Sequence, residues 1–482
     1  MIITMILLFV VGYAAIALEH LLKINKAAFA LLLCVVLWVV YILNAASILP
    51  ASAEFTLFAQ DAAKEHLSSF DKIISFVTEK QIIEHIGDVA EILFFLMGAM
   101  TIVELVDVHG GFSLITDWIT TRNKRKLLWL LSAITFVMSA LLDNMTTAIV
   151  MIMLLRKFIG NFKERWLFAG IIIIAANSGG AFSPIGDVTT IMLWVKGNVT
   201  TGEILPNLII PSLLSVLVPV LIVSRMLKGE FTRPISNHDT ESSNHLETAR
   251  YLNRSEKRTI FMLGLGSLVF VPIFRALTNL PPFIGVLFGL SVLWIYTELL
   301  YQRKQNIPEH DKARITIILG RIDIATILFF LGILMSVAAL ECSGILHSFS
   351  IFLAEKVGDI YVINILVGML SSIVDNVPLV AGAMGMYPLA NDTIIAAAAD
   401  PVYMANFVQD GTFWLFLAYC AGVGGSILII GSAAGVVTMG LEKINFVWYF
   451  KNITLLVFLG YLAGAAFFIV QELWLRPLLG LF

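Results

Sequence analysis

The chain has 482 residues, of which 59% are hydrophobic and 13% are charged, and its formal net charge is −3. A soluble domain carries about 25% charged residues, so this composition excludes an ordinary soluble protein. Apolar runs of about 17 residues or more recur along almost the whole chain, which predicts a polytopic membrane protein built of helices. A membrane β-barrel would instead show alternating segments of about 10 residues.

Several functional classes find no support in the residues. No segment matches the phosphate-binding pattern G-x-x-x-x-G-K-[ST], so we expect no ATP-driven transport by this chain. Cys34, Cys342 and Cys420 lie far apart in apolar surroundings, where buried single cysteines are expected and not a disulfide or a metal site. We therefore expect no cofactor and no nucleic-acid partner. A membrane enzyme is the least favoured class, because no set of nucleophile, base and acid converges on one face.

Apolar segments predict ten membrane spans in chain order. The first one lacks the basic region and the cleavage site of a signal peptide, so it is expected to remain as a span. The predicted spans are 2–18, 27–49, 91–107, 167–196, 205–225, 258–278, 283–300, 323–341, 413–441 and 446–470.

The stretch 127–155 is apolar but is predicted not to cross the membrane. Lysines and arginines flank both of its ends, which places both ends in the cytoplasm. A straight helix of this length would measure about 43 Å, too long for a hydrocarbon core of about 30 Å, whereas each arm alone is too short to cross. Length and charge therefore predict a re-entrant hairpin that enters from the cytoplasm, with Asp143 and Asn144 at its tip.

A second apolar stretch, 361–390, is flanked mainly by aspartate and glutamate, with Lys356 as the one nearby lysine. This charge pattern predicts a second hairpin that enters from the periplasm, with Asp375 and Asn376 at its tip. Basic loops elsewhere place both chain termini on the periplasmic side, and Arg476 is a mild exception to that topology.

The order of these segments predicts an inverted repeat. Five spans with a hairpin after the third are followed by five more with the same arrangement, and an odd number of spans inserts the second unit upside down. The motif "NSGGAFSPIG" pairs with "VGGSILIIG", which matches Gly180 to Gly425 and Gly186 to Gly431. Such repeats are typical of transporters, with the binding site near the midplane. The expected domains are a first repeat, a cytoplasmic linker and an inverted second repeat: 1–228, 229–257 and 258–482.

The spans 167–196 and 413–441 are predicted to be broken helices, because glycine and proline in these motifs cannot maintain a regular helix. A break exposes backbone carbonyls, and polar side chains flank both breaks. Each half therefore supplies a hairpin tip and a broken helix, which predicts two oxygen-rich pockets related by a pseudo-twofold axis. The polar residues at the breaks include Asn177, Asp187, Thr189, Thr190, Ser426 and Ser432.

Carboxylates, amide oxygens, hydroxyls and free carbonyls are hard ligands that suit a hard cation. The acids within the apolar segments are Asp143, Asp187 and Asp375, and no lysine or arginine lies deep inside these four elements. The sequence therefore favours a cation over an anion. A buried carboxylate can hold a proton or a sodium ion but holds both poorly. This competition is sufficient for antiport if the protein changes sides only when one of the two is bound.

The aspartates at the two tips also have a structural interpretation. Aspartate is a good N-cap, so Asp143 and Asp375 could cap the second helix of each hairpin, a role that is compatible with ligation. A further acidic group lies on span 91–107, where Glu91 and Glu104 are expected to be end groups that reach the interface. A role in proton entry is the second interpretation of this group, whose other candidates are His85 and Asp107. The amphipathic stretches 110–121 and 343–357 are expected to lie along the membrane interface.

The motifs "DNMTT", "NSGGAFSPIGDVTT", "ELVDVHGG" and "DNVPL" together resemble those of the NhaD-type sodium/proton antiporters of the ion transporter superfamily. The resemblance covers nearly the whole chain. It implies a bacterial inner-membrane protein that exchanges external protons for internal sodium or lithium in pH homeostasis. It also implies a homodimer with a scaffold domain and an elevator-like transport domain that holds both hairpins.

The resemblance also implies a set of cation- and proton-binding residues at the tips and the broken helices. Sodium is expected at the tips themselves, and Thr146 is a further candidate there. The second half lacks an equivalent of Asp187, since Ser432 follows Gly431. The binding residues implied by the motifs are Ser139, Asp143, Asn144, Asn177, Asp187, Thr189, Thr190, Ser371, Asp375, Asn376 and Ser432.

Three other transport functions stay open at this point. A sodium-coupled dicarboxylate symporter of the same superfamily has a similar architecture, but its Ser-Asn-Thr tips receive carboxylates, which the aspartates here would repel. An exporter of arsenite or another oxyanion has similar hairpins. A channel is disfavoured by the inverted broken helices.

Overall fold

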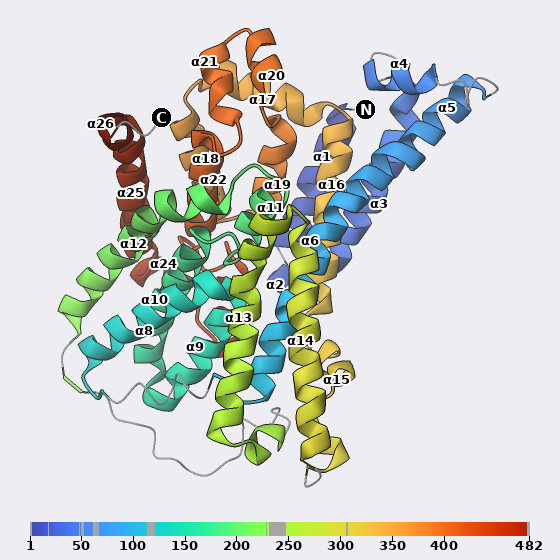
Figure 1. Ribbon diagram of the computed structural model, residues 1–482. Helices are drawn as coiled ribbons and strands as arrows, with labels where there is room; N and C mark the ends of the chain where they lie inside the picture. Colours follow the sequence, from blue (N-terminus) through green and yellow to red (C-terminus); the bar gives the residue numbers. More distant parts are fainter. Residues whose placement is uncertain are drawn as a thin grey trace. The chain divides into compact units, whose positions relative to one another are not determined.

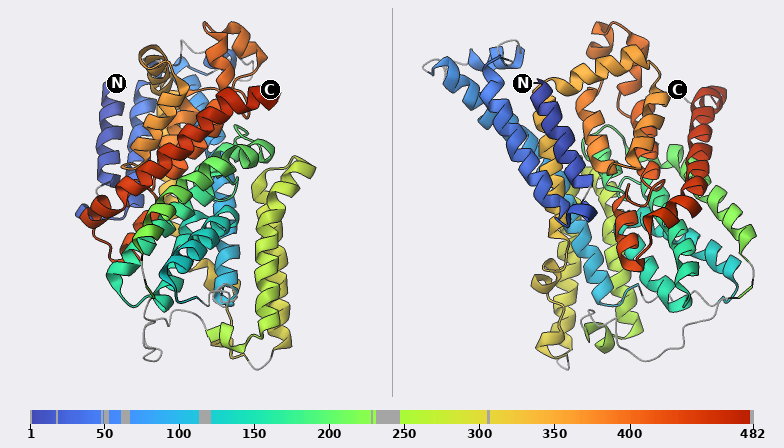
Figure 2. Two further views of the ribbon diagram at one scale, coloured as in Figure 1. Left: turned by 90° about the vertical axis from the view of Figure 1, so that its left-hand side faces the viewer. Right: turned by 180° about the vertical axis from the view of Figure 1, so that it is seen from behind.

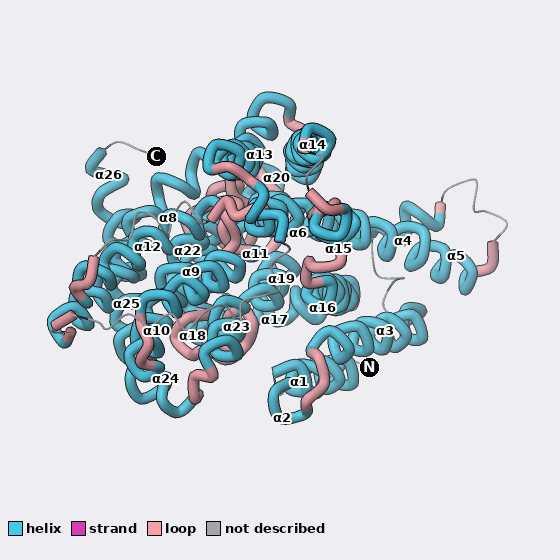
Figure 3. The backbone as a smooth tube through the Cα atoms, turned by 90° about the horizontal axis from the view of Figure 1, so that it is seen from below, coloured by secondary structure: helices cyan, strands magenta, loops and turns pink. Residues whose placement is uncertain are grey.

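A computed structural model describes the backbone of most of the chain (Figure 1). The described part consists of helices joined by loops (Figure 3). Its only β-type pairing is two isolated β-bridges, Asn123 with Glu230 and Ala390 with Val408. This confirms the predicted all-helical class. The described residues are 2–17, 19–47, 49, 53–60, 67–112, 121–227, 229–230, 247–304 and 307–479.

Seven helices among these residues are long and apolar enough to cross a membrane. They include most of the uninterrupted spans that the sequence predicts, and shorter apolar helices cover the remaining segments. A polytopic membrane protein is therefore confirmed. The seven are Lys26–Ser47, Ser69–Val108, Thr201–Met226, Arg254–Thr278, Pro282–Arg303, Ile324–Cys342 and Thr454–Leu475.

The chain forms two compact units. Along the chain the first passes into the second between Phe94 and Phe95, within the helix α6 (Ile83–Val108). Unit 1 comprises Met1–Phe94, Asp323–Asp359 and Val377–Pro388. Its helices are α1 (Ile2–Ala17), α2 (Glu19–Leu22), α3 (Lys26–Asn44), α4 (Ala53–Ala59), α5 (Ser69–Ser75), the start of α6 (Ile83–Val108), α16 (Ile324–Cys342), α17 (Ile345–Lys356) and α19 (Asn376–Met386).

The helices α3 and α16 pack closely in unit 1 because Gly332 lets the two backbones approach: a Cβ there would collide with the backbone at Ala30. The indole Nε1 of Trp38 donates to the carbonyl of Met335 at 2.9 Å. A hydrogen bond of this kind satisfies the one polar atom of a buried tryptophan.

Unit 2 comprises Phe95–Ile322, Ile360–Asn376 and Leu389–Phe482 and contains both predicted hairpin tips and both predicted broken helices. Its longer helices are α8 (Lys124–Leu141), α9 (Asn144–Phe158), α10 (Phe162–Ala181), α11 (Val188–Val195), α12 (Thr201–Met226), α13 (Arg254–Thr278), α14 (Pro282–Arg303), α18 (Ile360–Ser371), α22 (Thr412–Gly424), α23 (Ala433–Glu442) and α25 (Thr454–Val470). Short helices complete it: α15 (Ile315–Leu319), α20 (Asp392–Ala397), α21 (Pro401–Met404), α24 (Phe446–Asn452) and α26 (Arg476–Leu479).

Short irregular helical turns interrupt or extend several of these elements. Two of them are π-helices, Phe76–Ile82 between α5 and α6 and Gln471–Leu475 after α25. The others are 3-10 turns at Ala45–Ser47, Glu247–Tyr251, Glu309–Asp311 and Ala405–Phe407.

The core of unit 2 is made by α10, which is buried from Phe168 to Ala181, and by α22, which is buried along almost its whole length. Around them α12 and α25 run side by side (Figure 2). Gly460 and Gly464 of α25 face the carbonyls of Ser215 and Pro211 on α12 so closely that a Cβ would collide with them. Small residues four apart allow such close packing, and Pro219 leaves the Ser215 carbonyl without its helical donor.

Both predicted hairpin segments are helix pairs interrupted at the expected tips. The arms α8 and α9 are separated by Leu142 and Asp143, and α18 and α19 by residues 372–375. Both predicted breaks are also present, between α10 and α11 and between α22 and α23. The tips and breaks are therefore where the sequence places them, while membrane re-entry stays a prediction.

The two halves use the same contacts at equivalent positions. A Cβ on Gly179 would collide with the carbonyl of Phe136, and a Cβ on Gly424 would collide with the carbonyl of Gly368. Each first hairpin arm therefore lies directly against the broken helix of its own half. These matching contacts agree with an internal repeat, which stays a prediction.

Two predicted spans differ from the structure in their bounds. The span 91–107 is the end of a continuous helical rod, Ser69–Val108, with 40 residues and a length of about 60 Å. Charged residues before position 91 lower the hydropathy without ending the helix, which is why an apolar window starts too late. The last span, predicted as 446–470, is divided at Ile453, and the apolar helix runs over Thr454–Leu475.

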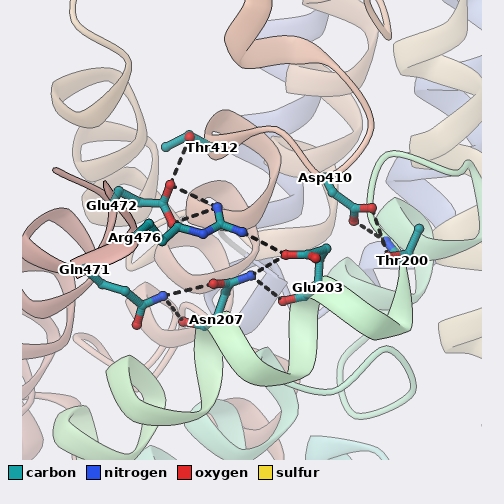
Figure 4. Close-up of polar contacts among 8 residues, drawn as sticks. All are labelled: Thr200, Glu203, Asn207, Asp410, Thr412, Gln471, Glu472 and Arg476. Carbon is teal, nitrogen blue, oxygen red and sulfur yellow. Dashed lines mark hydrogen bonds and ion pairs between the residues drawn. The ribbon is translucent and has the colours of Figure 1, made fainter. Parts of the chain in front are cut away.

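Other expectations meet the structure only in part. Arg476, the exception to the predicted topology, pairs with Glu203 at 2.8 Å and with Glu472 at 3.1 Å (Figure 4). The stretch 343–357 contains the helix α17, and its place at the membrane interface stays a prediction. Most of 110–121 and of the linker 229–257 lies outside the described residues, and α13 begins at Arg254.

Replacing Gly424 with alanine is expected to destabilise the fold, because the added methyl group meets the Gly368 carbonyl and cannot be accommodated without a backbone shift. Overpacking of this kind costs about 1–3 kcal/mol. The apparent melting temperature of the purified protein should fall. Gly266→Ala is the matched control, because a Cβ there has no atom within 4 Å. Equal melting temperatures for the two variants would contradict the expectation.

Candidate functional site

The carboxylate of Asp187 is the centre of a buried polar cluster. Its side chain is 1% exposed and caps the first turn of α11, where Oδ1 accepts from the Thr189 amide at 3.0 Å and from the Thr189 hydroxyl at 2.9 Å. The break before α11 is tight, since a Cβ on Gly180 would collide with the carbonyl of Gly186. Only glycine permits this return of the chain, and it brings Asp187 back against the end of α10.

The asparagines of both hairpin tips point at this one carboxylate. Asn144 donates from Nδ2 to Asp187 Oδ2 at 2.6 Å. Asn376 donates from Nδ2 to Oδ2 at 3.3 Å and to Oδ1 at 3.4 Å. Both asparagines are buried. The two tips, 232 positions apart in the sequence, therefore meet at one acidic side chain.

Asn177 extends the cluster to the second broken helix. Its Oδ1 accepts from Asn144 at 3.0 Å, and its Nδ2 donates to the hydroxyls of Ser426 and Ser432, each at 2.8 Å. Ser432 also caps α23 by accepting from the Gly435 amide. The sequence predicts two separate pockets, but the structure joins both breaks and both tips into one hydrogen-bonded network, because the buried helices α10 and α22 pack against each other.

The aspartates at the tips have a different environment from Asp187. Asp143 is half-buried and caps α9: Oδ1 accepts from the Thr146 amide at 2.8 Å and Oδ2 from the Thr146 hydroxyl at 2.5 Å. Asp375 is half-buried and directly precedes α19. The capping role is therefore present at Asp143, next to the cluster that Asn144 joins. The sequence predicts sodium at the two tips, whereas in the structure the carboxylate on which both tip asparagines converge is that of Asp187.

Three other predicted site residues bind the backbone. Ser139 donates to the carbonyl of Ala176 at 2.5 Å, and Ser371 donates to that of Ala421 at 2.8 Å. These bonds tie each first hairpin arm to the broken helix of its own half, at equivalent positions. Thr190 donates to the carbonyl of Asp187 at 2.8 Å. All three hydroxyls hold the site in shape, and each keeps an oxygen that can still accept.

The secondary candidates make contacts of other kinds. Glu104 lies 3.6 Å from Arg321, which agrees with an end group in an ion pair. His85 lies 3.3 Å from the sulfur of Cys342. Glu91 and Asp107 are half-buried along α6. The hydrogen bonds described for the Asp187 cluster include none of these four side chains.

Two members of the site region are absent from the residues implied by the motifs. Ser426 belongs to the network through Asn177, and the signal for it was its place in the second break. Thr147 is fully buried one position after Thr146, and its hydroxyl makes no hydrogen bond within the described structure. A buried hydroxyl of this kind is a spare oxygen beside the site.

His109 of the "ELVDVHGG" motif is a structural residue. It is fully buried, with Nδ1 2.6 Å from the carbonyl of Leu105 and Nε2 2.6 Å from the hydroxyl of Tyr301. The first contact requires a proton on Nδ1, so Nε2 accepts from the tyrosine. Burial lowers the pKa of His109 to about 4, which keeps the ring neutral at physiological pH.

The cluster has a defined chemical character. It contains a carboxylate, three amides and three hydroxyls, and its described hydrogen bonds include no lysine or arginine. An asparagine side chain can present either its nitrogen or its oxygen to the same neighbour. If the asparagine side chains rotate, their carbonyl oxygens face Asp187 in place of their NH2 groups. Oxygen ligands of this kind suit a small hard cation.

Two kinds of known membrane transporter are similar to the chain, one named for citrate and the other for sodium and protons. The family model described as "Citrate transporter" matches residues 13–409. The curated proteins similar to the chain over most of its length carry other names, however.

Two of these relatives are from Arabidopsis thaliana. "Sodium/proton antiporter 1" is 42% identical over 98% of this chain and 73% of its own length, and "Sodium/proton antiporter 2" is 39% identical over 95% and 97%. The "Na(+)/H(+) antiporter NhaD" of Vibrio cholerae is 33% identical over 80% of this chain and 79% of its own.

The pKa of His109 leads to a pH-dependent stability. The unfolded chain takes up a proton on this histidine near pH 6.5, whereas the folded protein takes it up only near pH 4, so folding is disfavoured as the pH falls through that window. His109→Gln should reduce the loss of melting temperature between pH 7 and pH 5. The two melting curves test this. An unchanged pH dependence in the variant would show that His109 is not the group concerned.

Proposed function

Because the chain belongs to the family of NhaD-type sodium/proton antiporters, we propose that it exchanges sodium or lithium ions for protons across a membrane. The observation that carries this proposal is the convergence of Asn144 and Asn376, one from each hairpin tip, on the buried carboxylate of Asp187.

Exchange follows from competition for this carboxylate. A charged side chain in a membrane interior is costly, so Asp187 favours a bound proton or a bound cation over neither. A cation requires oxygen ligands, which the amides of Asn144 and Asn376 provide if each rotates to present its carbonyl oxygen. A proton on Asp187 needs only one acceptor in place of one of the present donors. The two cargo ions therefore exclude each other, and antiport results if the protein changes sides only when one of them is bound.

The other predicted residues have supporting roles in this scheme. Asp143 and Asp375 stand directly before the two asparagines and add negative charge on the route to Asp187. Sodium ligation at both Asp–Asn pairs is thus retained from the sequence prediction, with Asp187 as their common partner. Asn177 sets the orientation of Asn144, and the hydroxyls of Thr189 and Ser432 lie within the same network.

The citrate transporter description of the family model raises the main alternative, a sodium-coupled carboxylate or oxyanion transporter. A carboxylate substrate at this site would meet Asp187, with Asp143 and Asp375 nearby and no basic side chain in the described network. Like charges disfavour such binding. The composition of the site therefore supports a cation as cargo.

The architecture that we propose for this function is an inverted repeat with two re-entrant hairpins and two broken helices. The equivalent bonds from Ser139 to Ala176 and from Ser371 to Ala421 support it. Alternating access by an elevator movement of the part that holds the hairpins, and assembly as a homodimer, complete the proposal from resemblance. The division into 1–228, 229–257 and 258–482 belongs to the same proposal.

The membrane in which the chain works is a separate matter. Relatives occur in Arabidopsis as well as in Vibrio, so family membership does not imply a bacterial inner membrane. Location in a membrane with multiple spans is established by the helices; the predicted bacterial inner membrane and periplasmic termini depend on the source of the chain.

Asp187→Asn is expected to abolish exchange, because an amide can neither take up the proton nor neutralise the cation. Everted vesicles that contain a pH-sensitive dye should show dequenching on addition of sodium or lithium with the native protein, and only the background of protein-free vesicles with the variant. Asp143→Asn and Asp375→Asn are expected to abolish exchange as well. Citrate-driven uptake without dequenching in the native protein would instead support the carboxylate transporter.

The matched control is Glu309→Gln, which removes an exposed carboxylate that pairs with Lys312 and Arg314 outside the site. It should leave the dequenching at the native level. Retained exchange in Asp187→Asn, at native expression, would remove that side chain from the mechanism.

Asn144→Ala and Asn376→Ala test the amide oxygens separately. Each removes one neutral ligand but keeps the carboxylate, so exchange should persist with a raised KM for sodium, by about tenfold on the scale of altered metal-site neighbours. The larger effect is expected for Asn144, which makes the shorter bond to Asp187. Native KM values in both variants would contradict direct ligation by the tips.

A further inference from the structure

The far ends of α11 and α23 carry a second feature that the proposed exchange does not use. Both helices begin at the polar cluster, α11 after Asp187 and α23 after Ser432. They are short, about 12 Å and 15 Å. A small tilt at the far end of such a rod moves its first residue, and with it the site.

The far end of α23 is held by ion pairs between one buried carboxylate and two arginines, of which Arg156 is 44% exposed and Arg165 is 20% exposed. The side chain of Glu442 is 0% exposed, and its two oxygens bind Arg156 Nε at 2.6 Å and Arg165 Nε at 2.8 Å. Trp166 donates from its indole to the Glu442 carbonyl at 2.9 Å, and Arg156 donates to the carbonyl of Leu441. The residues that hold α23 come from the end of α9 and the first turn of α10.

Arg165 also fixes the chain that joins these two helices. Its Nη1 donates to the carbonyls of Ile159 and Gly160 at 3.1 Å and 3.0 Å. One arginine therefore ties together the end of the first hairpin, the start of α10 and the end of α23. Three helices that contribute to the cluster at one end are joined at the other. Removing one partner of a buried ion pair is strongly unfavourable, because it leaves an unpaired charge.

The loop that follows α11, which leads from Val195 to the N-cap of α12 at Thr200, is held in an analogous way by the segment before α22. Asp410 accepts from the Thr200 amide at 2.5 Å and from the Thr200 hydroxyl at 2.9 Å (Figure 4). Its own amide donates to the carbonyl of Asn198 at 2.8 Å, and Gln409 donates to that of Gly197 at 2.8 Å. Asp410 has a positive φ of 60°, and both its amide and its side chain bind this loop.

The two sets of contacts occupy equivalent places in the two halves. When Gly180 is matched to Gly425, Arg165 falls on Asp410 and Gly197 falls on Glu442. Each half therefore holds the end of the other half's short helix from the same position. The charges differ: a cationic side chain holds a carboxylate in one case, and a carboxylate holds an amide and a hydroxyl in the other.

We propose that Glu442 and Asp410 are positioning residues for the cation site, each fixing the far end of the short helix that starts at the cluster. Glu442 sets the distance between Ser432 and Asn177, and Asp410 sets the place of Asp187. The expected effect on the KM rests on the proposed function. The contacts by which Glu442 and Asp410 hold the short helices do not depend on that function.

The test uses Glu442→Gln and Asp410→Asn in the full-length protein, with Glu309→Gln as the control for loss of an ion pair elsewhere. The KM for sodium should rise about tenfold in each variant. The maximal rate should change far less, since Asp187 is intact. A merely structural role would lower the amount of folded protein and the maximal rate without raising the KM.

Amide hydrogen exchange supplies the second measurement. Glu442→Gln should raise the rate of amide hydrogen exchange in 433–442 and leave that in 188–195 unchanged. Asp410→Asn should raise the rate in 188–195 and leave that in 433–442 unchanged. If Glu442→Gln does not fold, Arg165→Lys keeps the charge but loses the fork geometry, and it should give the same pattern more weakly. A native KM for sodium together with native rates of amide hydrogen exchange in these variants would overturn the proposal.

The two proposals fail in different ways. If the native protein shows no sodium-dependent proton movement, the proposed function fails. The rates of amide hydrogen exchange in 433–442 and 188–195 then still show whether Glu442 and Asp410 fix the two short helices. If sodium exchange is present and the clamp variants match Glu309→Gln in both measurements, only the positioning role fails.

Discussion

A carboxylate buried without a basic partner is the constraint on which this structure depends. Asp187 is almost fully covered, and its described hydrogen-bond donors are the Thr189 amide and hydroxyl and the amides of Asn144 and Asn376. Neutral donors satisfy a buried charge less completely than a lysine or an arginine would. In the proposed exchange the site therefore has an affinity for positive charge, which is the property that a proton and an alkali cation share.

The backbone makes this arrangement possible by interrupting two buried helices. Gly180 and Gly186 in one half, and Gly425 and Gly431 in the other, touch so closely that side chains are excluded. The interruptions free carbonyls and helix starts within the core, where intact helices would present only apolar side chains. Short helices with free ends need support, which the contacts of Glu442 and Asp410 supply at the opposite ends.

Members of this family differ in name between cation exchange and citrate transport, and the composition of the site gives a physical basis for such a difference. Tips that carry hydroxyl and amide groups alone can donate to an anionic substrate. Here each tip places an aspartate beside its asparagine, and the broken helix adds a third acid. The same hairpin architecture can therefore serve opposite charges, depending on the side chains at the two tips and in one break.

The sequence by itself determined the features that depend on local composition: the helical class, the hairpin tips at Asp143 and Asp375, and the breaks near Gly180 and Gly425. Hydropathy, turn-forming residues and charge act over a few neighbouring positions, so they can be read from a single chain. The tertiary structure decided what these pieces do together. Only packing of α10 against α22 joins Asn177 to Ser426 and brings both tip asparagines to Asp187, because hydrogen bonds across more than a hundred positions leave no local pattern.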